Sequence, residues 1–355
     1  MALPTLGTVG IVLAVVLGWI LYYEQQLQQP QYWPPVDSSA DAILVTGSHT
    51  GIGKATALTL ARDGFTVFCG VRQVEAHGTA LHATARDFGI PTERLRPVLL
   101  DVTKPEHVQA AVETIQAFLG PDRGLYGLFN NAGIATVDSN GLSVEDVSLE
   151  THRHIMEVNY FGALSVTKAF LPLLRQRQGR IVFNTSIAGF FAAPFACFYT
   201  VTKFATEALA DSLRREVAPL GVKVSVVRPG FTKSSILVHY TEGDFLAEGD
   251  AAAVAVSTDN VYAARLRKLR RRGVVEALQA TSTRLVAQAV AHAMRAPCPR
   301  TRYTVGHLSW ETRLLSWLPD AWLDALLAFV EMDLDHVTKE DLDKISSYAR
   351  EEVEI

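Results

Sequence analysis

The sequence predicts an α/β protein, a doubly wound sheet of seven parallel strands preceded by an N-terminal transmembrane helix. From Ala40 onward, short apolar runs alternate with longer helical patterns, and such a βαβ series forms a parallel sheet covered by helices. Residues 1–23 carry no charged side chain and are apolar enough to span a bilayer, which needs roughly 20 residues.

The composition limits the class of protein. The 355 residues are 48% hydrophobic and 20% charged, which suits a large buried core and excludes a disordered chain. The net charge of -4 argues against nucleic acid as the main partner. Cys69, Cys197 and Cys298 have neither the number nor the spacing of a disulfide framework or a zinc site, so no metal is expected.

The amino terminus is interpreted as an uncleaved single-pass anchor. Val9–Tyr23 is almost continuously apolar, with Trp19, Tyr22 and Tyr23 as an interfacial belt. A signal peptide would show a basic first segment and a small-residue cleavage site, and neither is present. No Lys or Arg flanks the anchor, so its orientation stays open, and residues 24–39 resemble a linker. We expect a membrane location, in the endoplasmic reticulum if the source is eukaryotic.

The seven strands are expected within a domain covering residues 40–306. They are apolar on both faces, as buried parallel strands should be. Their ranges are 42–46, 66–71, 95–100, 125–130, 180–186, 222–227 and 301–306. Ligands of such sheets bind beyond the carboxyl ends of the strands, near the point where the strand order reverses. Residues that directly follow the strands are therefore candidates for a functional site.

A glycine-rich loop, TGSHTGIG, follows the first strand and opens a helix expected from Ile52 to Gly64. Gly47, Gly51 and Gly53 lack the G-x-G-x-x-G spacing of the common dinucleotide fingerprint, so a plain turn is the alternative. The position favours phosphate binding, because helix amino termini attract anions and glycines let the backbone approach a pyrophosphate.

Three further strand ends carry informative residues. Arg72 follows the second strand, where NAD sites usually place an acidic residue; a guanidinium suits a 2′-phosphate, so NADP(H) is favoured over NAD(H). Asp101 ends the third strand as a helix cap or an adenine contact. The fourth strand ends in NNAG, where the asparagines can tie adjacent strands and Ala132 and Gly133 leave room for a flat ligand.

Catalytic residues are indicated by Ser186, Tyr199 and Lys203. A tyrosine and a lysine four residues apart project from one face of a helix. A tyrosine with a pKa of about 10 is a poor base, but a neighbouring ammonium and a nicotinamide cation would both lower that pKa. A Y-x-x-x-K pair alone arises often by chance, whereas its combination with a serine at a strand end favours catalysis.

Together these motifs resemble the classical short-chain dehydrogenase/reductase family. TGSHTGIG, LLDVT, NNAG, VNYFG, TSIAG, YTVTK and VRPG occur in the family's order and approximate spacing over about residues 41–306. The resemblance implies a seven-stranded Rossmann fold, hydride transfer between a nicotinamide and a carbinol carbon, and a possible homodimer.

The resemblance also implies roles for the matching residues. Tyr199 would act as general acid/base and Ser186 would polarise the substrate oxygen. Lys203 would lower the tyrosine pKa and bind the nicotinamide ribose, and Asn159 would hold a water of a proton relay. With Arg72, the cofactor-binding residues would be Gly47, Ser48, Gly51, Ile52, Gly53, Asp101, Val102, Asn131, Ala132, Gly133, Tyr199, Lys203, Pro229, Gly230 and Thr232.

Residues from about 232 to 280 are expected to form a substrate lid. Within them, the basic run Arg265–Arg272 lies opposite an apolar stripe of Tyr262, Leu266 and Leu269. This segment is expected to be a solvated helix, or else to contact anionic lipid head groups.

The carboxyl-terminal residues 307–355 are expected to form an amphipathic segment and an acidic tail. Residues 307–330 are rich in Trp and Leu and resemble the end of the retinol and hydroxysteroid dehydrogenase branch. There they would cover a hydrophobic substrate or dip into the membrane, and ordinary packing on the core or a dimer partner is the alternative. Residues 331–355 are expected to be solvated.

The sequence thus predicts a membrane-anchored NADP(H)-dependent oxidoreductase. It would interconvert a primary or secondary alcohol and a carbonyl on a hydrophobic substrate such as a steroid, a retinoid or a lipid-like molecule. The alternatives are an NAD-linked alcohol dehydrogenase of the same family and a non-catalytic scaffold that binds NADP.

Overall fold

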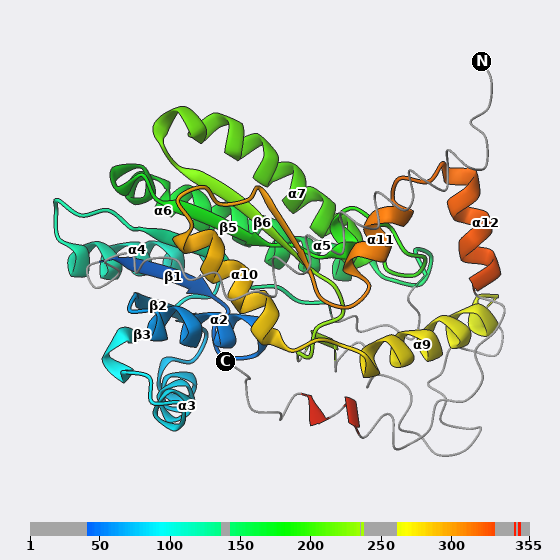
Figure 1. Ribbon diagram of the computed structural model, residues 1–355, viewed down its shortest axis with the longest axis horizontal. Helices are drawn as coiled ribbons and strands as arrows, with labels where there is room; N and C mark the ends of the chain where they lie inside the picture. The colour runs from blue at the N-terminus through cyan, green and yellow to red at the C-terminus, as the bar shows by residue number, and fades with distance from the viewer. Residues whose placement is uncertain are drawn as a thin grey trace. The chain divides into compact units, whose positions relative to one another are not determined.

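The computed structural model describes residues 41–135, 143–234, 236–237, 261–330, 344–345 and 347–348. Its centre is a sheet of seven parallel strands in the order β3-β2-β1-β4-β5-β6-β7 (Figure 1). The strands are β1 (Ala42–Thr46), β2 (Thr66–Val71), β3 (Leu95–Leu99), β4 (Gly127–Asn130), β5 (Arg180–Asn184), β6 (Lys223–Pro229) and β7 (Arg302–Val305). This confirms the doubly wound sheet, with strand ends within two residues of the expected ones.

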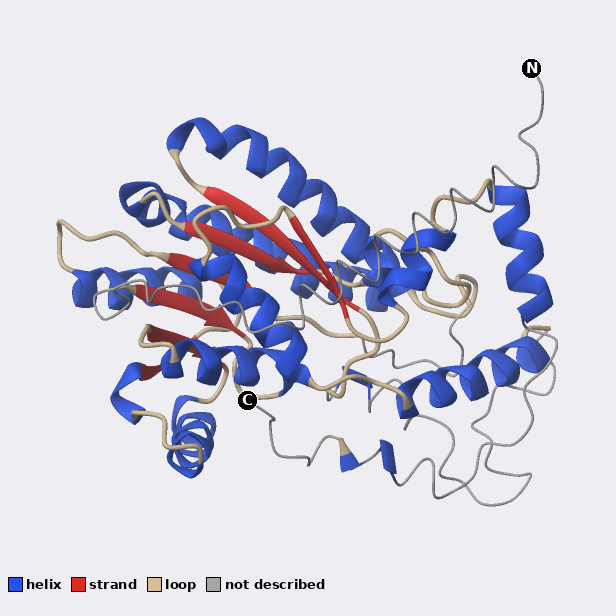
Figure 2. Cartoon of the chain, in the orientation of Figure 1, coloured by secondary structure: helices blue, strands red, loops and turns tan. Residues whose placement is uncertain are grey.

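Helices cover both faces of the sheet, as Figure 2 shows. One face packs against α2 (Gly51–Arg62), α3 (Val74–Asp87) and α10 (Thr283–Arg295). The other packs against α4 (Pro105–Leu119), α6 (Ala163–Arg177) and α7 (Cys197–Val217). The sheet therefore separates two hydrophobic cores.

The central strand β1 shows why its sequence is apolar without alternation. All five of its residues are buried. Because successive side chains of a strand point to opposite faces, Ile43 and Val45 join the core under α2, while Ala42 and Leu44 join the core under α6. Full burial of such side chains contributes about 1.5–3 kcal/mol each for the larger ones.

Shorter elements connect and extend this framework. Before β5 lie η2 (Thr92–Arg94), α5 (Leu149–Met156) and the π-helical turn η3 (Glu157–Gly162); after it lie η4 (Ile187–Gly189), η5 (Ala218–Leu220), α9 (Ala263–Leu278), α11 (Ser309–Leu315) and α12 (Asp320–Val330). Helix α9, in the segment expected to form the lid, turns its apolar stripe inward, since Leu266 is buried and Leu269 lines a cavity. Contact of α9 with lipid stays a prediction.

One segment differs from the expectation, and another lies outside the described residues. The tail was expected to be solvated, but Ile345 and Tyr348 are buried in a small core with Val274 of α9, so this part of the tail packs on that helix. The anchor and linker expected over residues 1–39 lie outside the described residues. In the part of the chain that the structure describes, no helix combines the length and apolarity that crossing a membrane requires.

Candidate active site

The loop between β1 and α2 has the backbone of a phosphate-binding turn. Gly47 and Gly51 have φ angles of +63° and +51°, in the left-handed region that favours glycine. A Cβ on Gly53 would come within 2.5 Å of the Asn131 side-chain nitrogen and closer still to the Gly47 carbonyl. The first N–H groups of α2, which starts at Gly51, have no partner within the helix. This cradle fits a pyrophosphate.

Residues after β4 close one side of the loop. The Thr46 hydroxyl accepts the main-chain N–H groups of Asn131 and Ala132, both at 2.9 Å. The Asn131 side-chain nitrogen donates to the carbonyls of Thr46 at 3.0 Å and Gly47 at 3.1 Å. Its oxygen accepts from Asn184 at 2.9 Å. As expected from NNAG, an asparagine ties adjacent strands, here where the strand order reverses.

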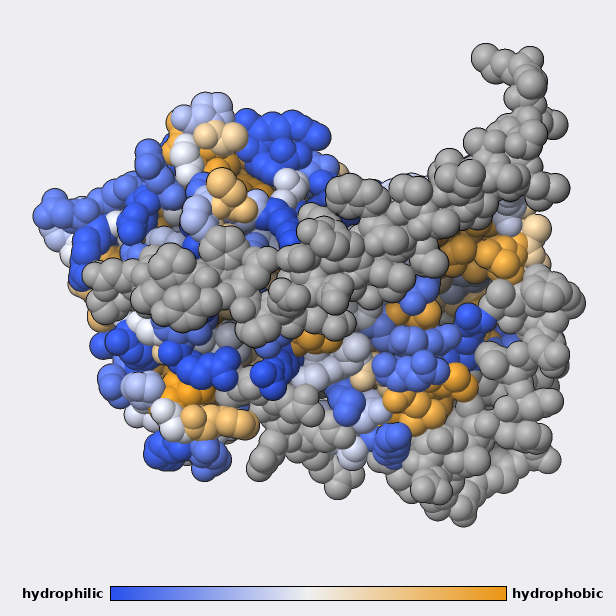
Figure 3. Space-filling model, in the orientation of Figure 1, coloured by the Kyte–Doolittle hydropathy of each residue, from blue (hydrophilic) through white to orange (hydrophobic). Residues whose placement is uncertain are grey.

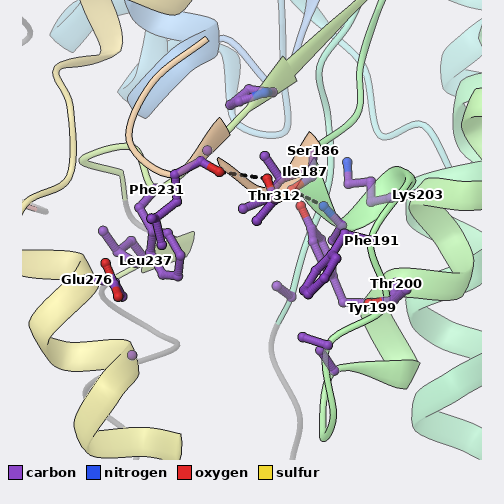
Figure 4. Close-up of a pocket in the computed structure, with 18 of the residues that line it drawn as sticks. Ser186, Ile187, Phe191, Tyr199, Thr200, Lys203, Phe231, Leu237, Glu276 and Thr312 are labelled. Carbon is purple, nitrogen blue, oxygen red and sulfur yellow. Dashed lines mark hydrogen bonds between the residues drawn. The ribbon is translucent and has the colours of Figure 1, made fainter. Parts of the chain in front are cut away.

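Ser186, Tyr199 and Lys203 come together at one wall of a cavity (Figure 4). Ser186 follows β5, and its hydroxyl accepts the N–H of Ala188 at 3.1 Å. Tyr199 and Lys203 lie on α7, which starts at Cys197, so the expected helical pair is present. The Lys203 Nζ lies 5.3 Å from the centre of the Tyr199 ring.

Burial is the largest influence on the pKa values of Lys203 and Tyr199. Burial lowers the pKa of Lys203 to about 8, with Glu207 acting in the opposite direction, and its Nζ donates to the Asn184 carbonyl at 3.1 Å. Burial raises the pKa of Tyr199 to about 12, although a hydrogen bond with Ser186 lowers it. Burial of the phenol outweighs that hydrogen bond. The lowering of the tyrosine pKa by Lys203 and a nicotinamide cation together stays a prediction.

Asn159 lies in η3, and a π-helical turn of this kind is often found at functional sites. Its buried side chain forms hydrogen bonds with neighbouring protein groups. The oxygen accepts the N–H of Ile134 at 2.8 Å, and the nitrogen donates to the Ile134 carbonyl at 2.9 Å and the Thr202 hydroxyl at 3.1 Å. Asn159 thereby ties the loop after β4 to α7, next to Lys203. The water relay through Asn159 stays a prediction.

Two of the predicted cofactor residues follow β2 and β3. Arg72 is exposed. Asp101 accepts the N–H of Thr103 at 3.0 Å and its hydroxyl at 2.7 Å, as a cap does. Burial raises the pKa of Asp101, but these hydrogen bonds and the charges of Arg72 and Lys104 outweigh burial and hold the pKa below its usual value. Arg72 and Asp101 are therefore electrostatic neighbours.

Several predicted residues hold the site together rather than face the cavity. The buried Ser48 hydroxyl donates to the Gly70 carbonyl of β2 at 3.2 Å. Val102 is buried beside Gly162 of η3. The predicted residues that line the cavity are Ile52, Asn131, Gly133, Ser186, Tyr199, Lys203, Pro229, Gly230 and Thr232.

The cavity has a volume of about 400 Å³ and mostly apolar walls. Sequence reasoning did not single out Phe191, Phe195 or Phe231, which line it. Its charged lining residues are Lys203, Arg272, Glu276 and Glu311. In Figure 4, Glu276 and Phe231 lie across the cavity from Tyr199. No short motif marks these residues, because they come from separate elements that meet only in the fold.

The carboxyl-terminal helices complete the wall of this cavity. Leu315 of α11 and Leu326 and Leu327 of α12 line it. Trp317 and Trp322 are 62% and 69% exposed. Figure 3 shows hydrophobic side chains gathered over α12. The segment thus covers the cavity, one of its two expected roles, and also leaves large apolar side chains on the surface.

A doubly wound sheet with a glycine loop after β1, and with a serine, a tyrosine and a lysine facing an apolar cavity, defines a nicotinamide-dependent oxidoreductase. In the described ranges no group of His, Cys, Asp or Glu residues could hold a metal ion.

The comparisons with known proteins agree. Residues 41–244 match the family model described as short chain dehydrogenase. The chain is 37% identical to D-beta-hydroxybutyrate dehydrogenase of Rattus norvegicus over 78% of this chain and 80% of that protein. It is 34% identical to Retinol dehydrogenase 5 of Mus musculus over 92% and 94%. It is 33% identical to 17-beta-hydroxysteroid dehydrogenase type 6 of Bos taurus over 80% and 87%.

A solved structure gives the same result. A short-chain dehydrogenase from Streptomyces avermitilis superposes with a TM-score of 0.59 at 27% identity, covering 82% of this chain and 95% of that one. The chain belongs to the short-chain dehydrogenase family and is an NAD(P)-dependent enzyme that acts on CH–OH groups.

Proposed function

We propose that this enzyme is membrane-anchored, prefers NADP(H), and interconverts an alcohol and a carbonyl on a hydrophobic substrate. The observation that carries the proposal is the cavity of about 400 Å³, whose walls are mostly apolar and which has Ser186, Tyr199 and Lys203 on one side. An apolar cavity with a few convergent polar groups is typical of a small-molecule site.

Tyr199 is proposed as the general acid/base. With its pKa at about 12 the phenol is protonated at neutral pH, so it can donate its proton to a carbonyl oxygen during reduction. Ser186, which hydrogen-bonds to Tyr199, would donate to the same oxygen and hold it in place. The cofactor, when bound, supplies or accepts the hydride.

Lys203 and Asn159 are proposed to support the function of Tyr199. Lys203 is charged below a pH of about 8, so at neutral pH its ammonium can stabilise a developing phenolate and donate to a ribose hydroxyl. Asn159 fixes α7 through Thr202 and thereby the position of Lys203. A Cβ on Gly133 would lie 3.1 Å from Asn159 Oδ1 and 3.7 Å from Lys203 Nζ, so glycine there leaves this space open.

The residues present fit a dinucleotide. Gly47, Gly51, Ile52 and Gly53 would hold the pyrophosphate, Asp101 and Val102 the adenine, and Asn131 with Ala132 the adjacent ribose. Preference for NADP(H) rests on Arg72, an exposed guanidinium at the end of β2. The runner-up is an NAD-linked alcohol dehydrogenase. The two hypotheses are separated by measuring the affinity of wild type and of Arg72→Ala for NADP(H) and for NAD(H). Only an enzyme that binds the 2′-phosphate through Arg72 should lose affinity on this change, and it should lose it for NADP(H).

The substrate class is inferred from the cavity walls together with the relatives. Relatives are named for hydroxybutyrate, retinol and hydroxysteroids. The three phenylalanines Phe191, Phe195 and Phe231 and the leucines of α11 and α12 favour a retinoid, steroid or lipid-like molecule over a small acid.

Membrane attachment and dimer formation are further parts of the proposal. The uncharged residues 1–23 support a single-pass anchor, and an endoplasmic-reticulum location in a eukaryote goes with it. The exposed apolar side chains of Phe161, Val201 and Phe204, on the neighbouring elements η3 and α7, support a homodimer, because larger exposed apolar patches mark protein interfaces.

The test is a panel of retinoids, steroids, aliphatic ketones and 3-hydroxybutyrate, assayed with each nicotinamide cofactor by absorbance at the reduced-cofactor band. We expect turnover of apolar substrates with NADP(H), and a loss of about 10²–10⁴-fold in Tyr199→Phe with cofactor binding retained. Unchanged turnover in Tyr199→Phe would reject the catalytic assignment. Cofactor binding with no turnover of any substrate would favour the non-catalytic scaffold.

A further inference from the structure

His49 and His77 form a stacked pair beside the glycine loop that the proposed roles do not use. His49 lies within TGSHTGIG, and His77 lies in the first turns of α3. Their ring centres are 4.4 Å apart and the rings are inclined by 16°. The Nδ1 atom of each ring is buried and has no hydrogen-bond partner. Because an unpaired buried polar atom costs free energy, two adjacent ones require an explanation.

The charges around the pair are mainly positive. Burial, then His77, then Arg72 lower the pKa of His49 to about 4, so the ring is neutral at pH 7. The acidic group near Arg72 is Asp101, which Lys104 also stabilises as a carboxylate. Glu75, on the first turn of α3, is exposed. The loop after β1, the end of β2 and the start of α3 thus bring two imidazoles and a guanidinium together.

The place of this cluster in the fold identifies its ligand. The residue after β2 is the one that meets the 2′ position of the adenosine ribose in doubly wound sheets. A 2′-phosphate carries close to two negative charges at pH 7 and three acceptor oxygens. That is the complement of one guanidinium and two imidazole rings, each able to donate a hydrogen bond.

We propose that His49 and His77, with Arg72, form the binding site for the 2′-phosphate of NADP(H), and that binding of the phosphate adds one proton to this cluster. The inference rests on the proposed NADP(H) preference and adds the residues that produce it. A nearby dianion favours the charged imidazole, so each binding event takes up a proton from solvent. NAD(H) carries no such phosphate and should bind without proton uptake.

The test uses the full-length protein in detergent and isothermal titration calorimetry at pH 7, in two buffers of different ionisation enthalpy. The ligands are adenosine 2′,5′-bisphosphate and adenosine 5′-monophosphate, followed by NADP⁺ and NAD⁺. The variants are His49→Gln and His77→Gln, which keep a hydrogen-bonding group but do not titrate. His154→Gln, at an exposed histidine of α5, is the control.

For wild type we expect tighter binding of the 2′-phosphorylated ligands and uptake of up to about one proton for these ligands alone. Each Gln variant should lose about tenfold in affinity for them, the value of one charge-assisted hydrogen bond, and should lose the proton uptake. Affinity for the ligands without a 2′-phosphate should not change, and the control should match wild type.

Equal losses for both ligand classes would assign the pair a structural role in the loop and overturn the proposal. An unchanged affinity ratio, absence of proton uptake in wild type, or a wild-type preference for NAD⁺ would overturn it as well. These results are distinct from failure of the proposed function. Turnover with NADH alone would support the oxidoreductase and reject the phosphate site. Tight NADP⁺ binding without turnover would support the phosphate site and reject the catalytic function.

Discussion

At the scale of a single residue, the proposed catalytic role of Lys203 has a cost in stability. Its side chain is 5% exposed, and its Nζ donates to a main-chain carbonyl instead of a carboxylate. Lowering its pKa from 10.5 to about 8 corresponds to roughly 3 kcal/mol of lost folding free energy at neutral pH, at about 1.4 kcal/mol per pH unit. A cost of this size supports a functional role for Lys203, because active sites often contain residues that lower stability.

Replacing Lys203 by methionine should stabilise the protein while abolishing turnover. We expect the free energy of unfolding at pH 7 to rise by about 1–3 kcal/mol, because a buried charge gives way to an apolar chain of similar length. Chemical denaturation measures this change. Lys168→Met, at an exposed lysine of α6, is the control and should leave stability unchanged.

The pH dependence of the free energy of unfolding tests the same account of Lys203. Lys203 binds its proton more weakly in the folded state, with a pKa of about 8, than in the unfolded state. Between pH 8 and about 10 the unfolded state binds more protons, so the unfolding free energy gains a contribution that rises with pH. Tyr199, raised to about 12, acts only above its ordinary value near 10. The rise should vanish in Lys203→Met, and its persistence would contradict this account.

At the scale of elements, one buried ion pair holds α7 against β6. Glu207 accepts from Arg228 Nε at 2.8 Å and Nη2 at 2.7 Å, and from the Thr185 hydroxyl at 2.7 Å. Both charged side chains are less than 10% exposed. The same Glu207 raises the pKa of Lys203, one turn earlier on α7. The pair therefore links the packing of the helix to the charge of the site.

Glu207→Gln should destabilise the protein by about 3–5 kcal/mol, because Arg228 is left as a buried charge without its counter-ion. The pKa of Lys203 should fall further, which moves the pH–rate profile to lower pH. The double variant Glu207→Met/Arg228→Leu removes both charges and should recover much of the stability. Thermal unfolding of Glu207→Gln, of the single variants Glu207→Met and Arg228→Leu, and of the double variant measures this. A loss in the double variant equal to the sum of the losses in its two single variants would show that the side chains act independently.

Elements and motifs were predictable to different degrees. The strands follow from local apolar runs, and Gly47, Gly51 and Gly53 follow a spacing that a short stretch contains. The wall formed by Phe191, Phe195 and Phe231 was not predictable, since the segment before α7 and the loop after β6 meet only through the tertiary fold. The burial that raises the pKa of Tyr199 was not predictable either, because no spacing of residues reveals burial.

At the scale of the whole molecule, the fold joins two functions that lie in different parts of the chain. The strand ends supply the proposed cofactor and proton-transfer site, whereas α9, α11 and α12 supply apolar walls of the cavity. A substrate that favours such walls also partitions into lipid. An enzyme for such a molecule gains from a membrane anchor, because its substrate is concentrated there.

Removal of the anchor should therefore release the protein from the membrane without abolishing its activity. Residues from Asp37 onward form one compact unit, and its sheet begins at Ala42, so deletion of residues 1–36 removes no strand and no described core residue.

We expect the full chain to remain in membranes after an alkaline carbonate wash, and the deleted form to be released by it. The wash distinguishes a spanning segment from peripheral contact through exposed residues such as Trp317 and Trp322. Turnover of a detergent-dissolved substrate should be retained within a few-fold. If the shortened chain still resists the wash, residues 1–23 are not the anchor; if the full chain is itself released, the protein has no spanning segment.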